Sequence, residues 1–199
     1  ITDPDFDEAE QLARKLGIPM ASGDPIDIIQ QAEIDAVVIC SPTDTHTEYI
    51  RACAVQEKHI FCEKPIDLDL EKIKNILEIV NEAGVQMMVG FNRRFDPNFA
   101  KIKALVNDGK IGDPQILKIT SRDPGPPPPQ YIKSSGGLFL DMAIHDFDMA
   151  RFIVQDEVEE VYSKGAVLID KEIGRLGDID TAITTLQFKN GAMGVIDNS

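Results

Sequence analysis

An aspartate and a histidine four residues apart form the clearest chemical pattern in this sequence. Asp141 and His145 lie in the stretch LFLDMAIHDFDMARF (138–152), whose apolar spacing predicts a helix with both side chains on one face. A carboxylate one turn away can orient an imidazole and raise its basicity, as general acid–base catalysis requires. A lone helical histidine is more often a packed structural residue, but the nearby Asp146 and Asp148 favour a catalytic role.

A charged pair ends a short apolar run earlier in the chain. Glu63 and Lys64 stand in the stretch FCEKP (61–65) and precede Pro65, which restricts the backbone and permits a cis peptide bond. A lysine just beyond a strand is poorly solvated in a closed cleft and can donate a hydrogen bond to a substrate hydroxyl. The alternative is a surface ion pair, which would contribute little to stability.

Hydroxyl groups follow another apolar run, in the stretch SPTDTH (41–46). Ser41, Pro42 and Thr43 come directly after the run, and His46 lies about one helical turn further on. Hydroxyl and free backbone N–H groups at this point can hold a dinucleotide. The alternative, equally supported by these residues alone, is that Thr43 or Asp44 only caps the following helix.

Two adjacent arginines follow a third apolar run, in the stretch GFNRRFD (90–96). Together with Asn92, the side chains of Arg93 and Arg94 suit carboxylates, phosphates or polyol oxygens. For one of the two arginines we expect a structural salt bridge between two domains instead.

Asp3 ends a short apolar stub and precedes a helical pattern. This arrangement is typical of the second strand of a Rossmann sheet, where an acidic residue binds the adenosine ribose and repels the 2′-phosphate of NADP. The alternative is that Asp3 caps the following helix. We expect the first strand and the glycine-rich turn of such a sheet upstream of Ile1, in a longer protein of which this chain is an internal piece.

The elements that must position these residues alternate in the first half of the chain. The patterns predict helices over 5–16, 24–31, 43–56 and 68–83, and strands over 34–40, 59–62 and 85–90. The continuous β-branched run at 34–40 predicts a strand buried on both faces. Strands separated by such helices predict a parallel sheet, which binds ligands beyond the carboxyl ends of its strands.

The second half has a different pattern. It predicts a helix over 137–154 and strands over 115–120, 158–168, 181–188 and 192–197. The last two strands are joined by Asn190-Gly191, a strong hairpin signal. The four consecutive prolines within 123–130 predict a loop or a polyproline II segment. The fold class is therefore α/β, with a Rossmann-type domain over 1–93 and an α+β domain with a mostly antiparallel open sheet over 94–199.

The composition excludes some functional classes. The 199-residue chain is 43% hydrophobic and has a formal net charge of −14, which disfavours nucleic acid and anionic membranes as partners. No apolar run is long enough to cross a membrane. We interpret Cys40, Cys53 and Cys62 as reduced core thiols of a cytoplasmic protein. We expect no metal site, because no third imidazole or thiolate stands at suitable spacing.

Taken in order, the motifs resemble the Gfo/Idh/MocA oxidoreductase family, and most closely its inositol-oxidising members. The resemblance rests on EKP (63–65), VGFNRRFD (89–96), IGDP (111–114) and GGLFLDMAIHDFDMARF (136–152), and it covers nearly the whole chain. It implies a Rossmann domain, an α/β domain with an open antiparallel sheet, and NAD, or less favourably NADP, as hydride carrier. It also implies a homodimer or tetramer formed through the outer face of that sheet.

The resemblance further implies oxidation of a secondary hydroxyl of a cyclic polyol, above all myo-inositol to 2-keto-inositol. The alternatives are another sugar, polyol or dihydrodiol dehydrogenase of the same family, or a non-catalytic NAD(P)-binding sensor. The catalytic residues implied are Lys64, Asp141 and His145, with His145 as the base. The substrate side would comprise Lys64, Asn92, Arg93, Asp123, Asp141 and His145, and the cofactor side Asp3, Ser41, Pro42, Thr43, His46, Glu63, Lys64 and Arg93.

Overall fold

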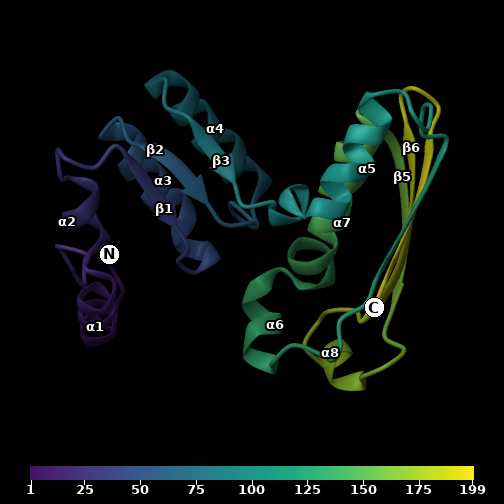
Figure 1. Ribbon diagram of the computed structural model, residues 1–199. Helices are drawn as coiled ribbons and strands as arrows, with labels where there is room; N and C mark the ends of the chain where they lie inside the picture. The colour runs from purple at the N-terminus through teal and green to yellow at the C-terminus, as the bar shows by residue number, and fades with distance from the viewer. The chain divides into compact units, whose positions relative to one another are not determined.

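The computed structural model describes residues 1–199 and divides them into two compact units, Ile1–Gly90 and Phe91–Ser199 (Figure 1). The division lies slightly before the boundary expected between residues 93 and 94. The ion pairs of Arg93 with Asp146 and of Arg94 with Asp148 explain this difference, because both carboxylates belong to the second unit.

The first unit is built on a three-stranded parallel sheet, as predicted. Strands β1 (Ala36–Ile39), β2 (His59–Cys62) and β3 (Met87–Val89) lie in the order β1-β2-β3, and both pairings are parallel. The helices of this unit are α1 (Phe6–Leu16), α2 (Pro25–Ile29), α3 (His46–Val55), preceded by the 3₁₀ turn η1 (Thr43–Thr45), and α4 (Leu70–Ala83).

Local capping sets the ends of these helices. Helix α1 begins after Asp5, whose side chain accepts the backbone N–H of Glu8, and ends at Gly17 with φ of 69°. Helix α4 begins after Asp69 in the same way and ends at Gly84 with φ of 68°. Both glycines take the left-handed conformation that a helix end favours and that other residues adopt with strain.

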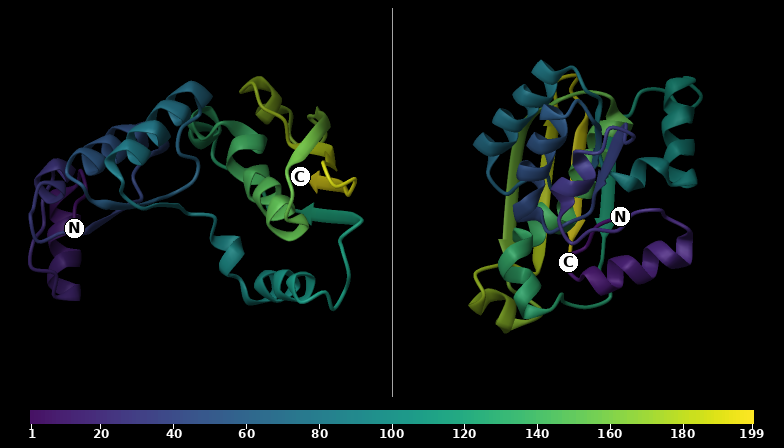
Figure 2. Two further views of the ribbon diagram at one scale, coloured as in Figure 1. Left: turned by 90° about the horizontal axis from the view of Figure 1, so that it is seen from above. Right: turned by 90° about the vertical axis from the view of Figure 1, so that its left-hand side faces the viewer.

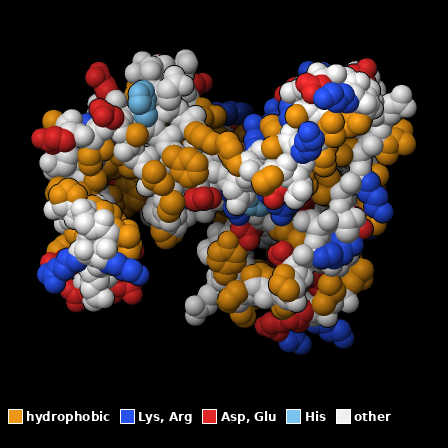
Figure 3. Space-filling model, in the orientation of Figure 1, with side chains coloured by type: hydrophobic (Ala, Val, Ile, Leu, Met, Phe, Trp, Pro, Cys, Tyr) orange, Lys and Arg blue, Asp and Glu red, His pale blue; other side chains and the backbone are white.

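Helices α3 and α4 cover one face of this sheet only. Ile50 and Ile76 pack there with the inward residues of β1 and β2. On the opposite face Val38, Phe61 and Met88 are aligned in register, and Val38 is 68% exposed. The prediction of a strand buried on both faces is therefore wrong for β1 in this unit, since no helix of the unit packs against that row. Figure 3 shows hydrophobic side chains at the surface there.

The three cysteines are free thiols, but they do not share one environment. Cys53 and Cys62 are buried, and desolvation raises the pKa of their thiols to about 11 and about 12. Cys40 is exposed just beyond β1, so the prediction of a core thiol is wrong at this position. The two buried thiols remain protonated at neutral pH and are poor nucleophiles.

The second unit contains a mixed sheet that is mostly antiparallel. Strands β4 (Ile116–Ser121), β7 (Met193–Asn198), β6 (Thr181–Phe188) and β5 (Val158–Ala166) lie in the order β4-β7-β6-β5. Only the β4–β7 pairing is parallel. The predicted hairpin joins β6 to β7, and Gly191 in its turn has φ of 88°. Figure 2 shows the four strands side by side with helices along one face.

The helices of this unit are η2 (Asn92–Phe95, a 3₁₀ turn), α5 (Pro97–Asn107), α6 (Pro129–Ser135), η3 (Leu138–Ala143, a π-helix), α7 (Ile144–Val154) and α8 (Lys171–Arg175). Helix α7 packs on the sheet through Ala150 and Val154 against Phe188 and Ile196. None of the helices is both long and apolar enough to span a bilayer. The sequence reasoning missed α5, although Asp96 caps it and proline occupies its first position.

The helix predicted over 137–154 is present, but it is not α-helical throughout. Its first part is the π-helix η3, and the α-helical part begins at Ile144. Gly137 precedes η3 with φ of 73° and ψ of −169°, a conformation available essentially to glycine alone. A Cβ atom there would lie 2.4 Å from Oδ1 of Asp178. The Asp178 carboxylate instead accepts the backbone N–H of Leu138, at 3.1 and 3.3 Å.

The proline-rich segment ends in a helix that was not expected. Pro128 is extended, with φ of −57° and ψ of 143°, and Pro129 occupies the first turn of α6. Proline suits this position because its missing N–H would have no partner within the helix. The prediction of a loop or polyproline II segment therefore holds up to Pro128 and fails at Pro129.

Asp180 fixes the turn between β5 and α8. Its carboxylate accepts the backbone N–H groups of Leu168, Ile169 and Asp170 at 2.8 to 2.9 Å. Burial opposes ionisation of Asp180, but these backbone donors and the hydroxyl of Thr181 outweigh it and lower the pKa of the carboxyl to about 2. The ionised form is therefore held more tightly in the folded state than in the unfolded chain.

We predict that the stability of the second unit falls as the pH decreases from about 4 to about 2, because Asp180 is protonated at a higher pH in the unfolded chain. Urea denaturation at a series of pH values measures this change. Asp180→Asn should be less stable at neutral pH and lose less free energy of unfolding over this window. Asp113→Asn, at an exposed position, is the matched control. Equal pH slopes in wild type and Asp180→Asn would contradict the assignment.

Candidate active site

The three strand exits of the first unit lie at one edge of its sheet. Ile39, Cys62 and Val89 are in register, so the residues that follow them continue from the same row. The backbone N–H of Glu63 donates to the carbonyl of Ile39, and that of Gly90 to the carbonyl of Cys62. The parallel pairing thus gathers three segments that are far apart in sequence.

Glu63 and Gly90 are matched at this edge. A Cβ atom on Gly90 would approach Oε2 of Glu63 to 2.9 Å, so the absence of a side chain makes room for the carboxylate. The same Oε2 atom accepts the backbone N–H of Lys64 at 3.3 Å, and the Lys64–Pro65 bond is cis. The missing side chain of Gly90 therefore lets the Glu63 carboxylate lie against the backbone at this edge.

The loop after β1 is held by a residue that the sequence reasoning missed. The hydroxyl of Thr45 lies 2.6 Å from that of Ser41 and donates to the carbonyl of Pro42 at 2.7 Å. Neither η1 nor α3 has a side-chain cap, so neither Thr43 nor Asp44 is the helix cap that we considered as the alternative. Thr45 could have been suspected only from its position within the same stretch.

His46 is buried beneath this edge, with 1% of its surface exposed. Its Nδ1 atom lies 2.8 Å from the carbonyl oxygen of Pro65, and its Nε2 atom 2.8 Å from that of Ser41. Both ring nitrogens are thus used inside the protein, and the ring ties the loop after β1 to the loop after β2. A contact of His46 with a cofactor stays a prediction.

Asp3 is exposed at the start of the chain. One of its carboxylate oxygens accepts the backbone N–H of Asp5 at 2.8 Å, but the residue that caps the following helix is Asp5 and not Asp3. The neighbouring Thr2 forms an isolated parallel bridge with Ser22. A role for Asp3 in ribose binding stays a prediction.

In the second unit, Asp141 and His145 stand on either side of the junction between η3 and α7. Both residues are half-buried. The ring of His145 lies edge-on to that of Phe91, with centroids 6.4 Å apart. The hydroxyl of Tyr131 donates to Oδ1 of Asp141 at 2.8 Å. Tyr131 was not among the predicted residues, since nothing in its sequence context links it to a residue ten positions later.

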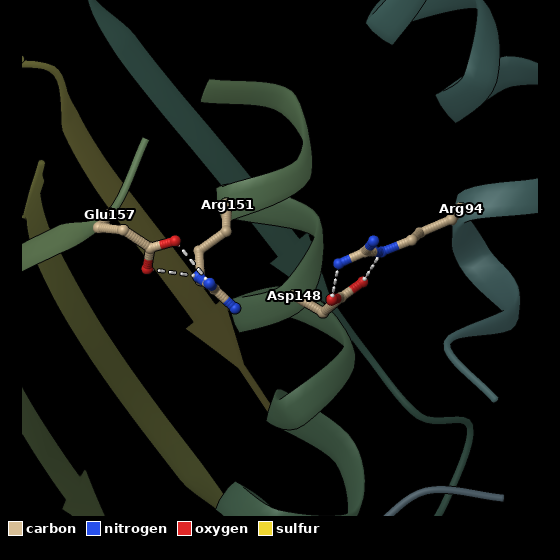
Figure 4. Close-up of polar contacts among 4 residues, drawn as sticks. All are labelled: Arg94, Asp148, Arg151 and Glu157. Carbon is tan, nitrogen blue, oxygen red and sulfur yellow. Dashed lines mark hydrogen bonds and ion pairs between the residues drawn. The ribbon is translucent and has the colours of Figure 1, made fainter. Parts of the chain in front are cut away.

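Both arginines of the η2 turn are paired with α7. Arg93 contacts Asp146 at 2.5 Å, and Arg94 makes a bidentate pair with Asp148 (Figure 4). The predicted ligand contact of Arg93 stays a prediction, and the expected salt bridge involves both arginines within one unit. The carboxylates that favoured a catalytic role for the helix are used here to hold it.

A second, fully buried contact holds the same helix to the sheet. Asp146 is 0% exposed, and its Oδ2 atom accepts a hydrogen bond from Nδ2 of Asn198 on β7 at 2.7 Å. At its far end, Arg151 makes a bidentate pair with Glu157, which Figure 4 also shows. Helix α7 is therefore tied to η2, to β7 and to the start of β5.

A cavity of about 200 Å³ lies beside Asp141. Its lining also includes Asp123, Asp178 and Ser199, with apolar walls that comprise Ile132, Leu138, Met142, Ile169, Ile173 and Ile179. The structure thus brings the predicted substrate residues Asp123 and Asp141 to one cavity. Asn92 and Arg93 do not line it. No three His, Cys, Asp or Glu side chains are grouped as metal ligands.

We predict that His46→Phe destabilises the first unit by about 2–4 kcal/mol, because two buried carbonyl oxygens lose their partner. Chemical denaturation measures this difference. His59→Phe is the control, since His59 is exposed and its contact, the backbone N–H of Gln86, can turn to water. Equal losses in the two variants would show that His46 does not hold the loops.

The comparisons with known proteins agree with this geometry. Residues 1–91 match the oxidoreductase family with an NAD-binding Rossmann fold, and residues 99–199 match the GFO/IDH/MocA C-terminal domain. The chain is 53% identical to the myo-inositol 2-dehydrogenase of Thermotoga maritima over all 199 residues, which cover 60% of that protein.

Two solved structures are similar over the whole chain. A myo-inositol dehydrogenase from Corynebacterium glutamicum has a TM-score of 0.94 and 43% identity, and 59% of its chain is covered. The scyllo-inositol dehydrogenase of Lactobacillus casei, with bound NAD(H) and scyllo-inositol, has a TM-score of 0.86 and 32% identity, and 60% of its chain is covered. The present chain thus spans about 60% of the length of these relatives. The chain belongs to the Gfo/Idh/MocA oxidoreductase family.

Proposed function

We propose that the protein carrying this chain oxidises a secondary hydroxyl of a cyclic polyol, most of all myo-inositol to 2-keto-inositol, with NAD as hydride acceptor. The observation that carries the proposal is the junction of η3 and α7, which carries both Asp141 and His145, together with a cavity that Asp141 and Asp123 line. The names of the relatives support the choice of substrate.

The residues of the chain supply the parts of the reaction that the cofactor does not. His145 takes the proton of the substrate hydroxyl as general base, and Asp141 orients it. Lys64 stabilises the negative charge that develops on the oxygen. Asn92 and Asp123 bind the other hydroxyls of the substrate, and Arg93, held by Asp146, positions Asn92 beside it in the η2 turn. NAD, when bound, accepts the hydride.

The cofactor would lie along the carboxyl edge of β1, β2 and β3. Ser41, Pro42 and Thr43 would contact it from the first loop, and Glu63 and Lys64 from the second. The support for this placement is the common edge of the three strand exits, where Glu63 is held against Gly90. The exposed carboxylate of Asp3 favours NAD over NADP, because it would repel a 2′-phosphate.

The second candidate is a non-catalytic NAD(P)-binding sensor. A sensor does not need Lys64, Asp141 and His145 together, and their joint presence favours the enzyme. Within the enzymes, another sugar, polyol or dihydrodiol is the alternative substrate. The relatives act, by their names, on both myo- and scyllo-inositol, so the stereochemistry of the substrate must be measured.

Exposed apolar side chains on the outer face of the second sheet favour a homo-oligomer. Ile116, Tyr162, Ile183 and Met193 lie on this face and are 54–72% exposed, and Ile116 is paired with Met193. A face of this kind is typical of a surface that is covered by a partner. We infer a dimer or tetramer in the cytoplasm, where free thiols such as these persist.

We predict that Lys64→Ala and His145→Ala each lower the turnover of the full-length protein by about 10²–10⁴-fold, because each removes a group that acts on the reacting oxygen. The affinity for NAD should persist in His145→Ala, which is not assigned to the cofactor side. Steady-state kinetics with myo-inositol, scyllo-inositol and glucose, each with NAD and NADP, measure the effect and rank the substrates.

Lys74→Ala, at an exposed position of α4, is the matched control and should retain activity. Near-normal turnover in either active-site variant would refute the assignment. Tight NAD binding without hydride transfer to any polyol would favour the sensor.

We predict that Ile183→Lys lowers the oligomeric state of the full-length protein, because a charge on the outer sheet face must be desolvated in the interface. Light scattering coupled to size-exclusion chromatography measures the mass. Ile111→Lys, an exposed position outside the sheet, should leave the mass unchanged. A wild-type monomer, or an oligomer that tolerates Ile183→Lys, would refute this interface.

A further inference from the structure

The proline-rich segment leads directly into α6, the short helix that carries Tyr131. Pro128 is extended and Pro129 occupies the first turn, while Gly136 ends the helix in a left-handed conformation with φ of 83°. Proline restricts φ and so reduces the number of conformations open to the segment. Both ends of α6 are thus fixed by residues with strong backbone preferences, and the direction of Tyr131 is set with them.

Tyr131 reaches from α6 to the acid–base pair. Its hydroxyl donates to Oδ1 of Asp141 at 2.8 Å, although the residue as a whole is 46% exposed. Desolvation of the phenol, followed by its hydrogen bond to the carboxylate of Asp141, raises the pKa of Tyr131 to about 12. The hydroxyl therefore stays protonated, and it remains a donor over the whole range in which an enzyme of this family works.

The backbone that carries Asp141 is held from a different direction. Asp178, in the loop after α8, accepts the backbone N–H of Leu138 at the start of η3. Asp141, Asp178 and Ile132, the neighbour of Tyr131 on α6, all line the same cavity. Asp178 thus holds the backbone at the start of η3, and Tyr131 holds the side chain of Asp141 within it.

We propose that Tyr131 is a positioning residue of the acid–base site, which fixes the Asp141 carboxylate through the hydrogen bond to Oδ1 and so orients the group that serves His145. The proposal rests on the proposed function, because it assigns Tyr131 to the same oxidation. The proposal also assigns a structural role to the proline-rich segment, because that segment fixes the position of α6, which carries Tyr131. A hydrogen bond to an ionised carboxylate is among the stronger ones in proteins, which is what such positioning requires.

The test is Tyr131→Phe in the full-length protein, which removes only the hydroxyl. We expect kcat for the polyol to fall about 10- to 100-fold, as the loss of a hydrogen bond to a charged group allows. The KM for the polyol and the affinity for NAD should stay within about twofold, because a positioning residue acts on the transition state more than on binding. Tyr49→Phe, on α3 of the first unit, is the matched control and should retain the wild-type kcat.

Two kinetic outcomes would overturn the proposal. An unchanged kcat would show that Asp141 does not need the Tyr131 hydroxyl. A raised KM with unchanged kcat would show that Tyr131 binds the polyol directly and does not act through Asp141.

A second measurement separates this proposal from the proposed function. A double-mutant cycle of Tyr131→Phe and Asp141→Asn, read as the unfolding equilibrium constant, reports the hydrogen bond without any turnover. We expect the two changes to be non-additive by roughly tenfold. If the wild-type protein oxidised no polyol, the proposed function would be refuted. The cycle could still show that the two substitutions are non-additive, and so confirm the hydrogen bond between Tyr131 and Asp141. Additive changes would overturn the Tyr131 proposal even in an active enzyme.

Discussion

The second unit depends on a buried negative charge on helix α7. Asp146 has no exposed surface, and an ionised carboxylate in such a place is strongly destabilising unless it is compensated. Arg93 and Asn198 provide that compensation, one from the η2 turn and one from the sheet. Because His145 is the next residue in the chain, whatever places Asp146 also places the proposed base. The neighbouring pair of Arg94 and Asp148 repeats the same connection one step further along the helix.

A backbone constraint at the start of this helix has equal weight. Gly137 takes a conformation that is closed to residues with a side chain, and Asp178 occupies the space where a Cβ atom would lie. The wider π turn that follows carries Asp141, whose carboxylate is held by Tyr131. π-helical turns are found frequently at functional sites, and this one contains the carboxylate partner of the proposed base and ends shortly before that base. The anchors of the site come from η2, α6, the loop after α8, and β7.

In the first unit, the direction of the strands places the candidate cofactor-binding residues at one edge of the sheet. Parallel pairing brings the loops after β1, β2 and β3 to one edge, and the buried ring of His46 joins two of them from below. The residues offered to a cofactor at this edge are backbone groups, hydroxyls and Glu63, which suit a dinucleotide. Backbone N–H groups at this edge can donate hydrogen bonds to phosphates. The net charge of −14 therefore does not prevent the protein from binding a phosphate-bearing ligand there.

The sequence by itself determined the order of the strands and of the helices of the first unit, the parallel sheet, the β6–β7 hairpin and the positions of the three strand exits. These features follow from periodicity, from caps such as Asp5 and Gly17, and from turn residues such as Asn190 and Gly191, all of which act over a few neighbouring residues. Only the tertiary structure decided that His46 is buried, that Arg93 and Arg94 are paired with α7, and that Tyr131 meets Asp141. It also decided that the helix before His145 begins as a π turn. The physical reason is that the partners of these side chains are distant in sequence, and nothing in the local pattern of a polar residue specifies whether it will face a ligand, a carboxylate or a buried carbonyl.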